Sequence, residues 1–334
     1  MLVVRPAGLA DIDALLDLAF LSGKGFTSLP EDRAVLTERL ALSTASFAGD
    51  VAPADAWYML MLTESETGEV EGVAGIKGSV GVKRPHFSFR IVTLAQFSPA
   101  AGTRFDHQAL VLVNECSGHS EVGSLFLRPR KRQAGAGSLL ARARYALIGM
   151  HRELFGPAVM AELRGWFDEQ DESPFWKGIA SKFFRLPFDE ADRMITSTDG
   201  QFILDLAPRH PIYLELVDPV AREAIGAVHR HGVRAHEMLK NEGFVRSGLI
   251  DIFDGGPTVT CDRDRIRTIA EARRLACVVG DPGEAAPRRL LARGGLADFR
   301  ATVVPAATDG DTVIVPPDAL HALGATAGEV LFVS

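Results

Sequence analysis

Short, mostly apolar runs, several of them bounded by turn-rich segments, recur along the chain and predict β-strands. The first is expected at residues 2–5. Two more, at 57–63 and 71–76, are joined by the turn-rich segment SETGE and predict a hairpin, so the sheet is mixed or antiparallel at this end. Further strands are expected at 121–127, 159–164, 201–206 and 247–253, with short valine-rich strands at 312–315 and 330–333.

Other stretches carry apolar residues at helical spacing. From residue 11 to 21 the apolar positions include Ile12, Leu15, Leu16 and Ala19, which share one helical face. Helices are likewise expected at 138–155, 174–184, 221–228 and 234–241. This mixture predicts an α+β fold in which helices flank a mixed, mainly antiparallel sheet. We place the domain boundaries at 1–195, 196–270 and 271–334, the last being a small β-rich tail packed on the second unit.

Composition and charge narrow the class of protein. The chain has 334 residues, of which 47% are hydrophobic and 24% charged, enough to bury the cores of two compact units. Its formal net charge of −7 argues against nucleic-acid binding. No apolar run reaches membrane-spanning length, and Arg5 and Pro6 interrupt the start, so we expect a cytoplasmic protein without a membrane partner. Three widely spaced cysteines support neither a disulfide framework nor a cysteine zinc site.

The most informative stretch lies between the expected strand at 121–127 and the helix that follows it. Residues 132–138 read RQAGAGS, so successive backbone amides and the helix N-terminus can point together at a bound anion. Residues 128–132 add four basic side chains, which suit a ligand with several phosphates. A plain glycine turn before a helix is the structural alternative. The P-loop sequence is absent, and Leu140 stands where the dinucleotide fingerprint needs a small residue.

The remaining pattern, RxxGxG, resembles the pyrophosphate loop of the GNAT acyltransferase superfamily. This resemblance implies a GNAT-like first unit that holds acyl-CoA, and a second, smaller GNAT-like unit. In that superfamily the backbone of the preceding strand holds the pantetheine arm. The residues implied for acyl-CoA are Leu125, Phe126 and Leu127 in the strand and Arg132, Gln133, Gly135, Ala136, Gly137 and Ser138 in the loop.

Longer segments narrow the match. They are FTSLP at 26–30, SEVGSLFL at 120–127, AELRG at 161–165, SPFW at 173–176, HPIY at 210–213, AIGAVH at 224–229 and IDIFDGGPT at 250–258. Together, with nearly constant spacing from Met1 to about Ile269, they resemble the arginine N-succinyltransferase family.

That family implies transfer of a succinyl group from succinyl-CoA to the α-amine of L-arginine, in arginine catabolism. Succinyl-CoA is then a co-substrate, with no tightly bound cofactor and no metal. The family also suggests a homo-oligomer, alone or with a related paralogous subunit. His229, in AIGAVH, falls on the family's catalytic histidine, the proton donor, and Leu125 falls on a succinyl-CoA contact.

The residues themselves fit this chemistry. An α-ammonium must lose a proton to attack, and the departing thiolate gains one, so a histidine is useful. Many GNAT enzymes use a tyrosine, but the SPFW segment offers Phe175 and Trp176 instead. Without the family, His229 would be interpreted as a surface or capping residue. We interpret His231 and His236 as surface residues, because no carboxylate stands at metal-ligand spacing.

Carboxylates in the family-like segments are candidates for the substrate guanidinium: Glu162, Asp251 and Asp254. Each could instead belong to a structural hydrogen-bond network. Arg164 could meet the carboxylate of arginine, that of the succinyl group, or a neighbouring acid. The sequence departs from the family at 230–235, at Lys24 and beyond Leu275. Two alternatives therefore stay open: a GNAT enzyme that uses acetyl-CoA or ornithine, and a CoA-binding regulatory module that has lost catalysis.

Overall fold

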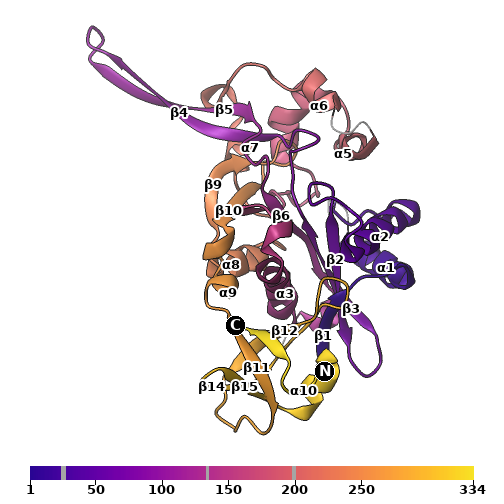
Figure 1. Cartoon of the computed structure of the whole chain (residues 1–334). Helices are drawn as coiled ribbons and strands as arrows, with labels where there is room; N and C mark the ends of the chain where they lie inside the picture. Colours follow the sequence, from indigo (N-terminus) through magenta and orange to yellow (C-terminus); the bar gives the residue numbers. More distant parts are fainter. Residues whose placement is uncertain (24–27, 133–134, 198–200) are drawn as a thin grey trace. The chain divides into compact units, whose positions relative to one another are not determined.

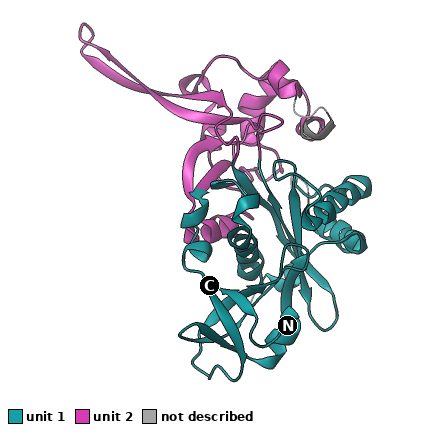
Figure 2. Cartoon of the chain, in the orientation of Figure 1, with its two compact units in different colours: residues 1–79, 119–159, 261–334 teal, residues 80–118, 160–260 magenta. Residues whose placement is uncertain are grey.

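The chain folds into two compact units (Figure 2), as described by a computed structural model for residues 1–23, 28–132, 135–197 and 201–334. Unit 1 comprises Met1–Ser79, His119–Val159 and Cys261–Ser334, and unit 2 comprises Val80–Gly118 and Met160–Thr260. The expected boundaries at 195 and 270 do not coincide with this division. The tail from residue 271 belongs to unit 1, and not to the second unit on which we expected it to pack.

Unit 1 is a layered structure in which α1 and α2 cover one face of a sheet and α3 covers the other (Figure 1). Its strands follow the order β14-β15-β11-β16-β12-β13-β1-β2-β3-β6, antiparallel throughout except for the parallel pair β11 and β15. Its helices are α1 (Ile12–Ser22), α2 (Arg33–Ala48), α3 (Ala136–Met150), α9 (Arg267–Ala270) and α10 (Pro317–Leu323), and its strands are β1 (Leu2–Pro6), β2 (Trp57–Glu64), β3 (Val70–Lys77), β6 (Ser120–Leu127), β11 (Arg273–Val279), β12 (Arg288–Arg293), β13 (Arg300–Pro305), β14 (Ala307–Asp309), β15 (Thr312–Val315) and β16 (Val330–Val333).

The core of unit 1 explains why β2 is apolar on both faces. Met59 and Met61 point toward α1 and α2, where they join one hydrophobic cluster, while Leu60 points the other way because side chains alternate along a strand. The helix α2 is fixed at both ends. Asp32 accepts the backbone N–H groups of Ala34 and Val35, and Gly49 ends the helix in the left-handed conformation.

The C-terminal tail completes unit 1. Strand β13 pairs with β1 at Ala301 and Val4, and the Thr302 hydroxyl donates to the Leu2 carbonyl at 2.8 Å. On the other side of the tail, Arg142 of α3 donates to the hydroxyl of Ser334 at 3.1 Å. These contacts tie residues that are 192 to 300 positions apart in the chain, so the tail is a structural part of unit 1.

Unit 2 contains a second antiparallel arrangement, in the order β10-β9-β4-β5-β8. Strands β4 and β5 form a long hairpin that projects from the rest of its unit (Figure 1), and an aromatic cluster around Trp176, Phe184 and Phe253 forms the core. The elements of unit 2 are β4 (Ser88–Ser98), β5 (Thr103–Val113), β8 (Ile212–Tyr213), β9 (Val245–Ile250), a π-helical turn (Trp176–Ala180), α4 (Ser181–Phe184), α5 (Phe188–Ser197), α6 (Gln201–Leu206), α7 (Pro219–Glu223) and α8 (Val233–Asn241), while β7 (Ala158–Glu162) and β10 (Pro257–Asp262) cross the boundary between the units.

Two predicted elements are wrong. Residues 201–206 form the helix α6 and not a strand, because Phe202 and Ile203 both enter the aromatic core, which adjacent positions on one strand face cannot do. The predicted helix at 221–228 ends at Glu223, since Gly226 has φ of 69° and turns the backbone out of the helix. The hairpin of β4 and β5 was not predicted.

The expected fold class is confirmed. The chain is α+β, with a mixed, mainly antiparallel sheet flanked by helices and a β-rich C-terminal region. No helix in the part of the chain that the structure describes is long and apolar enough to cross a bilayer.

Candidate active site

The strand that precedes the glycine turn in unit 1 carries a β-bulge. Between the pairs Val73–Phe126 and Gly75–Gly123, three residues of β6 advance against two of β3. Ser124 lies in this interval with φ of 51°, a left-handed conformation that is uncommon for a residue other than glycine. The bulge changes the direction of the backbone at Leu125, so it presents the segment 125–127 at an angle to the rest of the strand.

The turn after β6 leads into the N-terminus of α3. Gly135 precedes the helix with φ of 82°, and no side chain caps the helix there. The amides of Ala136, Gly137 and Ser138 lie in the first turn, where helical N–H groups have no carbonyl partner within the helix. This end of α3 therefore suits a phosphate group. Gln133, also expected to bind acyl-CoA, lies outside the described residues.

The basic side chains beside this turn have protein partners, which the sequence did not reveal. Arg130 pairs with Glu69 and Glu71, and Lys131 donates to Glu64 at 2.6 Å. Arg128 lies 3.4 Å from Asp17. The guanidinium of Arg132 lies over the ring of Phe126, at 5.4 Å. The expected excess of positive charge is thus partly neutralised, and the backbone amides of α3 become the better-supported anion ligands.

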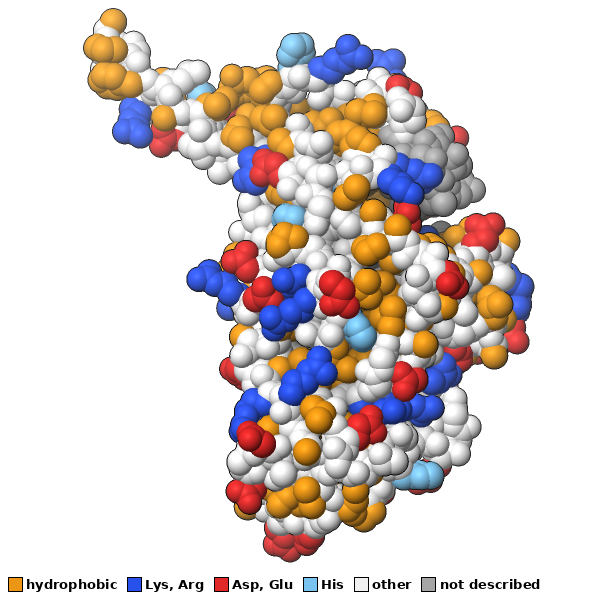
Figure 3. Space-filling model, in the orientation of Figure 1, with side chains coloured by type: hydrophobic (Ala, Val, Ile, Leu, Met, Phe, Trp, Pro, Cys, Tyr) orange, Lys and Arg blue, Asp and Glu red, His pale blue; other side chains and the backbone are white. Residues whose placement is uncertain are grey.

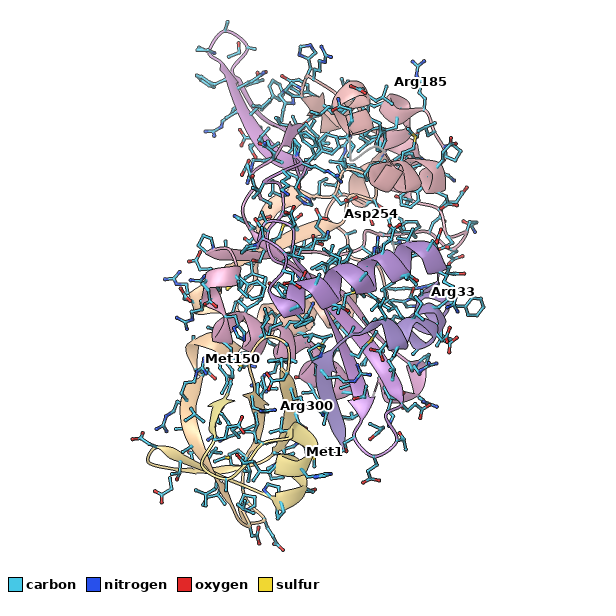
Figure 4. The ribbon with its side chains drawn as sticks, turned by 45° about the vertical axis from the view of Figure 1, so that its right-hand side comes forward. Met1, Arg33, Met150, Arg185, Asp254 and Arg300 are labelled. Carbon is cyan, nitrogen blue, oxygen red and sulfur yellow. The ribbon has the colours of Figure 1, made fainter. Side chains whose placement is uncertain are left out.

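In unit 2 a loop between β9 and β10 clamps the end of β7. Asp251 accepts the N–H groups of Phe253 and Asp254, and Asp254, labelled in Figure 4, accepts those of Gly165 and Gly256, all at 2.8 Å. Both oxygens of Asp254 are thereby used by the backbone. Burial raises the pKa of both carboxyl groups, and the neighbouring Asp254 raises that of Asp251 further.

His229 lies against this clamped segment. Its backbone N–H donates to the carbonyl of Arg164 at 2.8 Å, and its side chain is 4% exposed. The ring nitrogen Nδ1 accepts the backbone N–H of His231 at 3.2 Å. Burial, together with the charges of Arg164, His231 and Arg230, lowers the pKa of His229 to about 4. His229 is therefore neutral near pH 7, with its proton on Nε2.

The Arg164 guanidinium also lies in this part of unit 2. It stacks over Phe167 at 4.3 Å, and the same ring meets that of His229 edge-on, with centroids 6.0 Å apart. Burial lowers the pKa of Arg164, and the charges of Asp171 and Asp254 act against this shift. Arg164 stays charged nonetheless, because an arginine titrates far above neutral pH.

Glu162 is engaged with a histidine. Its Oε1 lies 3.1 Å from Nε2 of His86, and both side chains are partly buried. The Glu162 charge contributes to the raised pKa values of Asp251 and Asp254. A cationic group bound beside these three acids would stabilise their ionised forms.

The residues singled out from the sequence thus gather in two places. Those for acyl-CoA lie along β6 and α3 in unit 1, while His229, Glu162, Arg164, Asp251 and Asp254 lie together in unit 2. Sequence reasoning missed Phe167, Asp171 and His86. Phe167 and Asp171 lie just beyond the AELRG segment, so their nearness to Arg164 was available from the sequence, whereas nothing pointed to His86.

Unit 1 is GNAT-like. Its elements follow the order β1-α1-α2-β2-β3-β6-α3, with a bulge in β6, a glycine turn after it and an uncapped N-terminus of α3. The chain is an enzyme of the acyltransferase class. A family model described as "Arginine N-succinyltransferase beta subunit" matches residues 2–268, and that of its C-terminal domain matches residues 273–333. The chain belongs to this arginine N-succinyltransferase family.

Individual relatives agree with this assignment. The chain is 36% identical to an arginine N-succinyltransferase of Citrobacter koseri, and 37% identical to an arginine N-succinyltransferase subunit beta of Pseudomonas aeruginosa; each match covers 98% of this chain and 96% of the relative. The solved structure of the arginine/ornithine succinyltransferase subunit AI from Pseudomonas aeruginosa superposes with a TM-score of 0.90 at 33% identity, covering 100% of this chain and 98% of that one.

Proposed function

We propose that the protein transfers the succinyl group of succinyl-CoA to the α-amine of L-arginine, as a step of arginine catabolism. The observation that carries this proposal is the match to relatives named arginine N-succinyltransferase over 98% of the chain. The site supports it, because a buried neutral histidine accompanies an anion-binding helix N-terminus within the same chain. The backbone of Leu125–Leu127 and the amides of Gly135–Ser138 are the proposed ligands of the donor.

In the proposed reaction the α-ammonium first loses one proton to solvent. The free amine forms the C–N bond at the thioester carbon, the C–S bond breaks, and the nitrogen gives up its second proton as the thiolate takes one up. His229 keeps its proton on Nε2, so it donates a hydrogen bond to the negative charge that develops on the thioester oxygen or on the departing sulfur. In this role His229 acts as a hydrogen-bond donor in its neutral form and not as a cation.

Glu162, with the Asp251 and Asp254 pair behind it, is proposed to attract the guanidinium of arginine. The backbone bonds of Asp251 and Asp254 favour a positioning role for these two carboxyl groups. The carboxylate of Glu162 meets the side chain of a histidine, His86. It is therefore the better candidate for direct contact with the substrate.

Ornithine is a second candidate acceptor. The solved relative from Pseudomonas aeruginosa is titled an arginine/ornithine succinyltransferase. Ornithine shares the α-amine and α-carboxylate of arginine and differs in the charged group at the far end of the side chain. Comparison of kcat/KM for the two amino acids would separate the alternatives.

The test is thiol release from succinyl-CoA in the presence of L-arginine, with acetyl-CoA as the competing donor. The wild type should prefer succinyl-CoA. His229→Gln should lower kcat by about 100-fold to 1000-fold, the usual effect of removing one donor to a developing oxyanion. His321→Ala, which changes an exposed histidine of α10 in unit 1, is the matched control and should retain activity. No release from the wild type with either donor would contradict the proposal.

We also propose that the protein works as a homo-oligomer through the hairpin of β4 and β5. In the half of the hairpin nearer its tip, residues 93–98 of β4 pair with residues 103–108 of β5 and with no other described strand. Phe97 and Phe105 in this half are 69% and 53% exposed. Figure 3 shows hydrophobic side chains gathered at this tip. An isolated two-stranded ribbon is marginally stable in water, so a second copy is expected to cover it. The name of the Pseudomonas aeruginosa relative, a subunit, supports an assembly.

A further inference from the structure

One edge of the Arg164 guanidinium makes no hydrogen bond with the residues that the structure describes. Its Nε and Nη2 atoms are both buried, and neither has a hydrogen-bond partner among the residues that the structure describes. The side chain as a whole is 18% exposed. Buried donors are nearly always satisfied, and a charged donor left without a partner is costly. Such a pair of atoms therefore indicates a ligand.

We propose that this edge of Arg164 binds a substrate carboxylate beside His229. The inference rests on the proposed function and deepens it, by assigning the residue that selects a carboxylate-bearing substrate. Nε–H and one N–H of Nη2 point in parallel from the same side of the planar guanidinium. Their spacing matches the two oxygens of a carboxylate, so the pair can donate two hydrogen bonds at once.

Among the described residues, no acid forms a hydrogen bond with this edge. Asp171 forms an ion pair with it, but its Oδ1 lies 3.7 Å from Nη2, beyond hydrogen-bond distance, and its side chain is 57% exposed. The oxygens of Asp254 accept the N–H groups of Gly165 and Gly256 instead. A carboxylate at the Arg164 edge must therefore come from a bound molecule.

The residues around Arg164 fix the orientation of its guanidinium plane and favour the binding of an anion. The ring of Phe167 lies 4.3 Å from the guanidinium carbon and fixes the plane in which the N–H groups point. The charge of Arg230 reaches both Arg164 and His229, since it lowers the pKa of each. A carboxylate bound here would relieve this repulsion, and the backbone bond between His229 and Arg164 would hold it near the imidazole.

Two substrates of the proposed reaction carry such a carboxylate: the succinyl group at its free end, and the amino acid at its α-carbon. The experiment separates them with matched analogues, in kcat/KM measured by thiol release. In the donor arm, succinyl-CoA is compared with butyryl-CoA, which has the same four carbons and no carboxylate. In the acceptor arm, L-arginine is compared with agmatine, which lacks the α-carboxylate.

We expect the wild type to prefer the carboxylate-bearing substrate by about 100-fold or more in one arm, because a site built for a hydrogen-bonded group strongly rejects an analogue without it. In Arg164→Gln this preference should fall below about 3-fold, chiefly through loss of activity on the carboxylate-bearing substrate. Arg164→Lys keeps the charge but not the two-donor edge, so it should recover only part of the preference. The arm that responds identifies the source of the carboxylate.

Arg265→Gln removes a positive charge from a side chain that is 82% exposed, and it is the matched control. Thermal unfolding of each variant shows whether it folds, and Arg164→Lys serves if Arg164→Gln does not. A wild type without preference in either arm, or variants that lose activity equally on all substrates, would overturn the inference. Absence of any transfer from succinyl-CoA to L-arginine by the wild type would instead contradict the proposed function.

Discussion

The Nδ1 atom of His229 accepts a backbone N–H, and this bond determines what the imidazole can do. Protonation of Nδ1 would place a second hydrogen against the N–H of His231 and break the bond. The same form is disfavoured by burial and by the charges of Arg164 and Arg230. His229 can therefore donate a hydrogen bond from Nε2 at neutral pH, but it does not readily take up a second proton.

The pKa of His229 should be measurable directly by NMR titration of the histidine ring carbons, with His229→Gln to assign the signal. We expect a midpoint near pH 4. Because the folded state releases this proton more readily than the unfolded chain, the protein should lose stability as the pH falls from about 6.5 toward 4. His229→Gln should lose less over that interval. A His229 midpoint at or above 6.5 would contradict the neutral-donor role.

Asp251 should behave in the opposite sense. Burial and the neighbouring carboxyl groups raise its pKa, so the folded state holds the proton longer than the unfolded chain and stability falls as the pH rises from about 4. Asp251→Asn keeps the oxygen that accepts the N–H groups of Phe253 and Asp254 and should remove this dependence. Asp251→Ala should cost about 1–3 kcal/mol per lost bond. Urea unfolding at pH 5 and pH 8 measures both variants, and an unchanged pH dependence of stability in Asp251→Asn would count against the raised pKa of Asp251.

At the residue scale the sequence pointed to His229 and Arg164 through the segments AIGAVH and AELRG, and the structure brings both into one cluster. A structural hydrogen-bond network was one of the two roles considered for Asp254, but its partners were not predictable. Its partner Gly165 is 89 positions away, and only the fold brings the two together. The same holds for the basic residues near the glycine turn, whose partners Glu64, Glu69 and Glu71 come from a distant hairpin.

At the scale of elements, the loop 251–256 works because its glycines allow a very close approach. A Cβ on Gly256 would lie 1.9 Å from the carbonyl oxygen of Leu163, and one on Gly165 would lie 2.2 Å from that of Asp254. Both contacts are with backbone atoms, which cannot rotate away. The glycines therefore allow the loop to hold the segment that carries Arg164.

Gly256→Ala should thus destabilise the protein by about 3 kcal/mol or more, since backbone must shift to relieve the overlap. It should also lower the activity that depends on Arg164. Gly8→Ala is the matched control, because nothing lies within 4 Å of its added Cβ and its φ is not positive. Chemical unfolding of the two variants tests the difference. Equal stabilities would show that the loop can yield.

Elements were predictable where pattern and packing agree. The valine-rich stretches at 312–315 and 330–333 form β15 and β16 with the expected bounds. Burial alternates along β15, and the last three residues of β16 are buried. The prediction of a strand at 201–206 was wrong because the packing of this segment depends on aromatic residues elsewhere in the chain, in particular Phe184 and Phe253. The hairpin of β4 and β5 was not predicted because polar residues interrupt the apolar pattern in the half nearer its tip, where the strands are largely exposed.

At the scale of the whole molecule, the hairpin should decide the oligomeric state. Replacing Phe97 and Phe105 together by serine should shift the protein to a smaller species in light scattering coupled to size exclusion, since apolar contacts are lost from a surface that a second copy covers. Phe20→Ser is the control, because Phe20 of α1 is 70% exposed on the other unit. A monomeric wild type would contradict the proposal.

The division into units could not be predicted from a linear scan for boundaries. Unit 2 is made of two separate inserts, and unit 1 is closed by the last strands of the chain. Two of the four boundaries fall inside strands, because β7 and β10 continue from one unit into the other. The pairing of β13 with β1, which joins residues near opposite ends of the sequence, shows that the last strands belong to unit 1.

This closure also orders events during synthesis. Strand β1 leaves the ribosome about 300 residues before its neighbour β13. Until then β1 has a bare edge, and α3 lacks the contacts that the tail gives it. Unit 2 has all of its residues once Thr260 is made, before β13 begins at Arg300. The nascent chain therefore carries an unfinished sheet until β13 is made, which is the period when a chaperone would matter most.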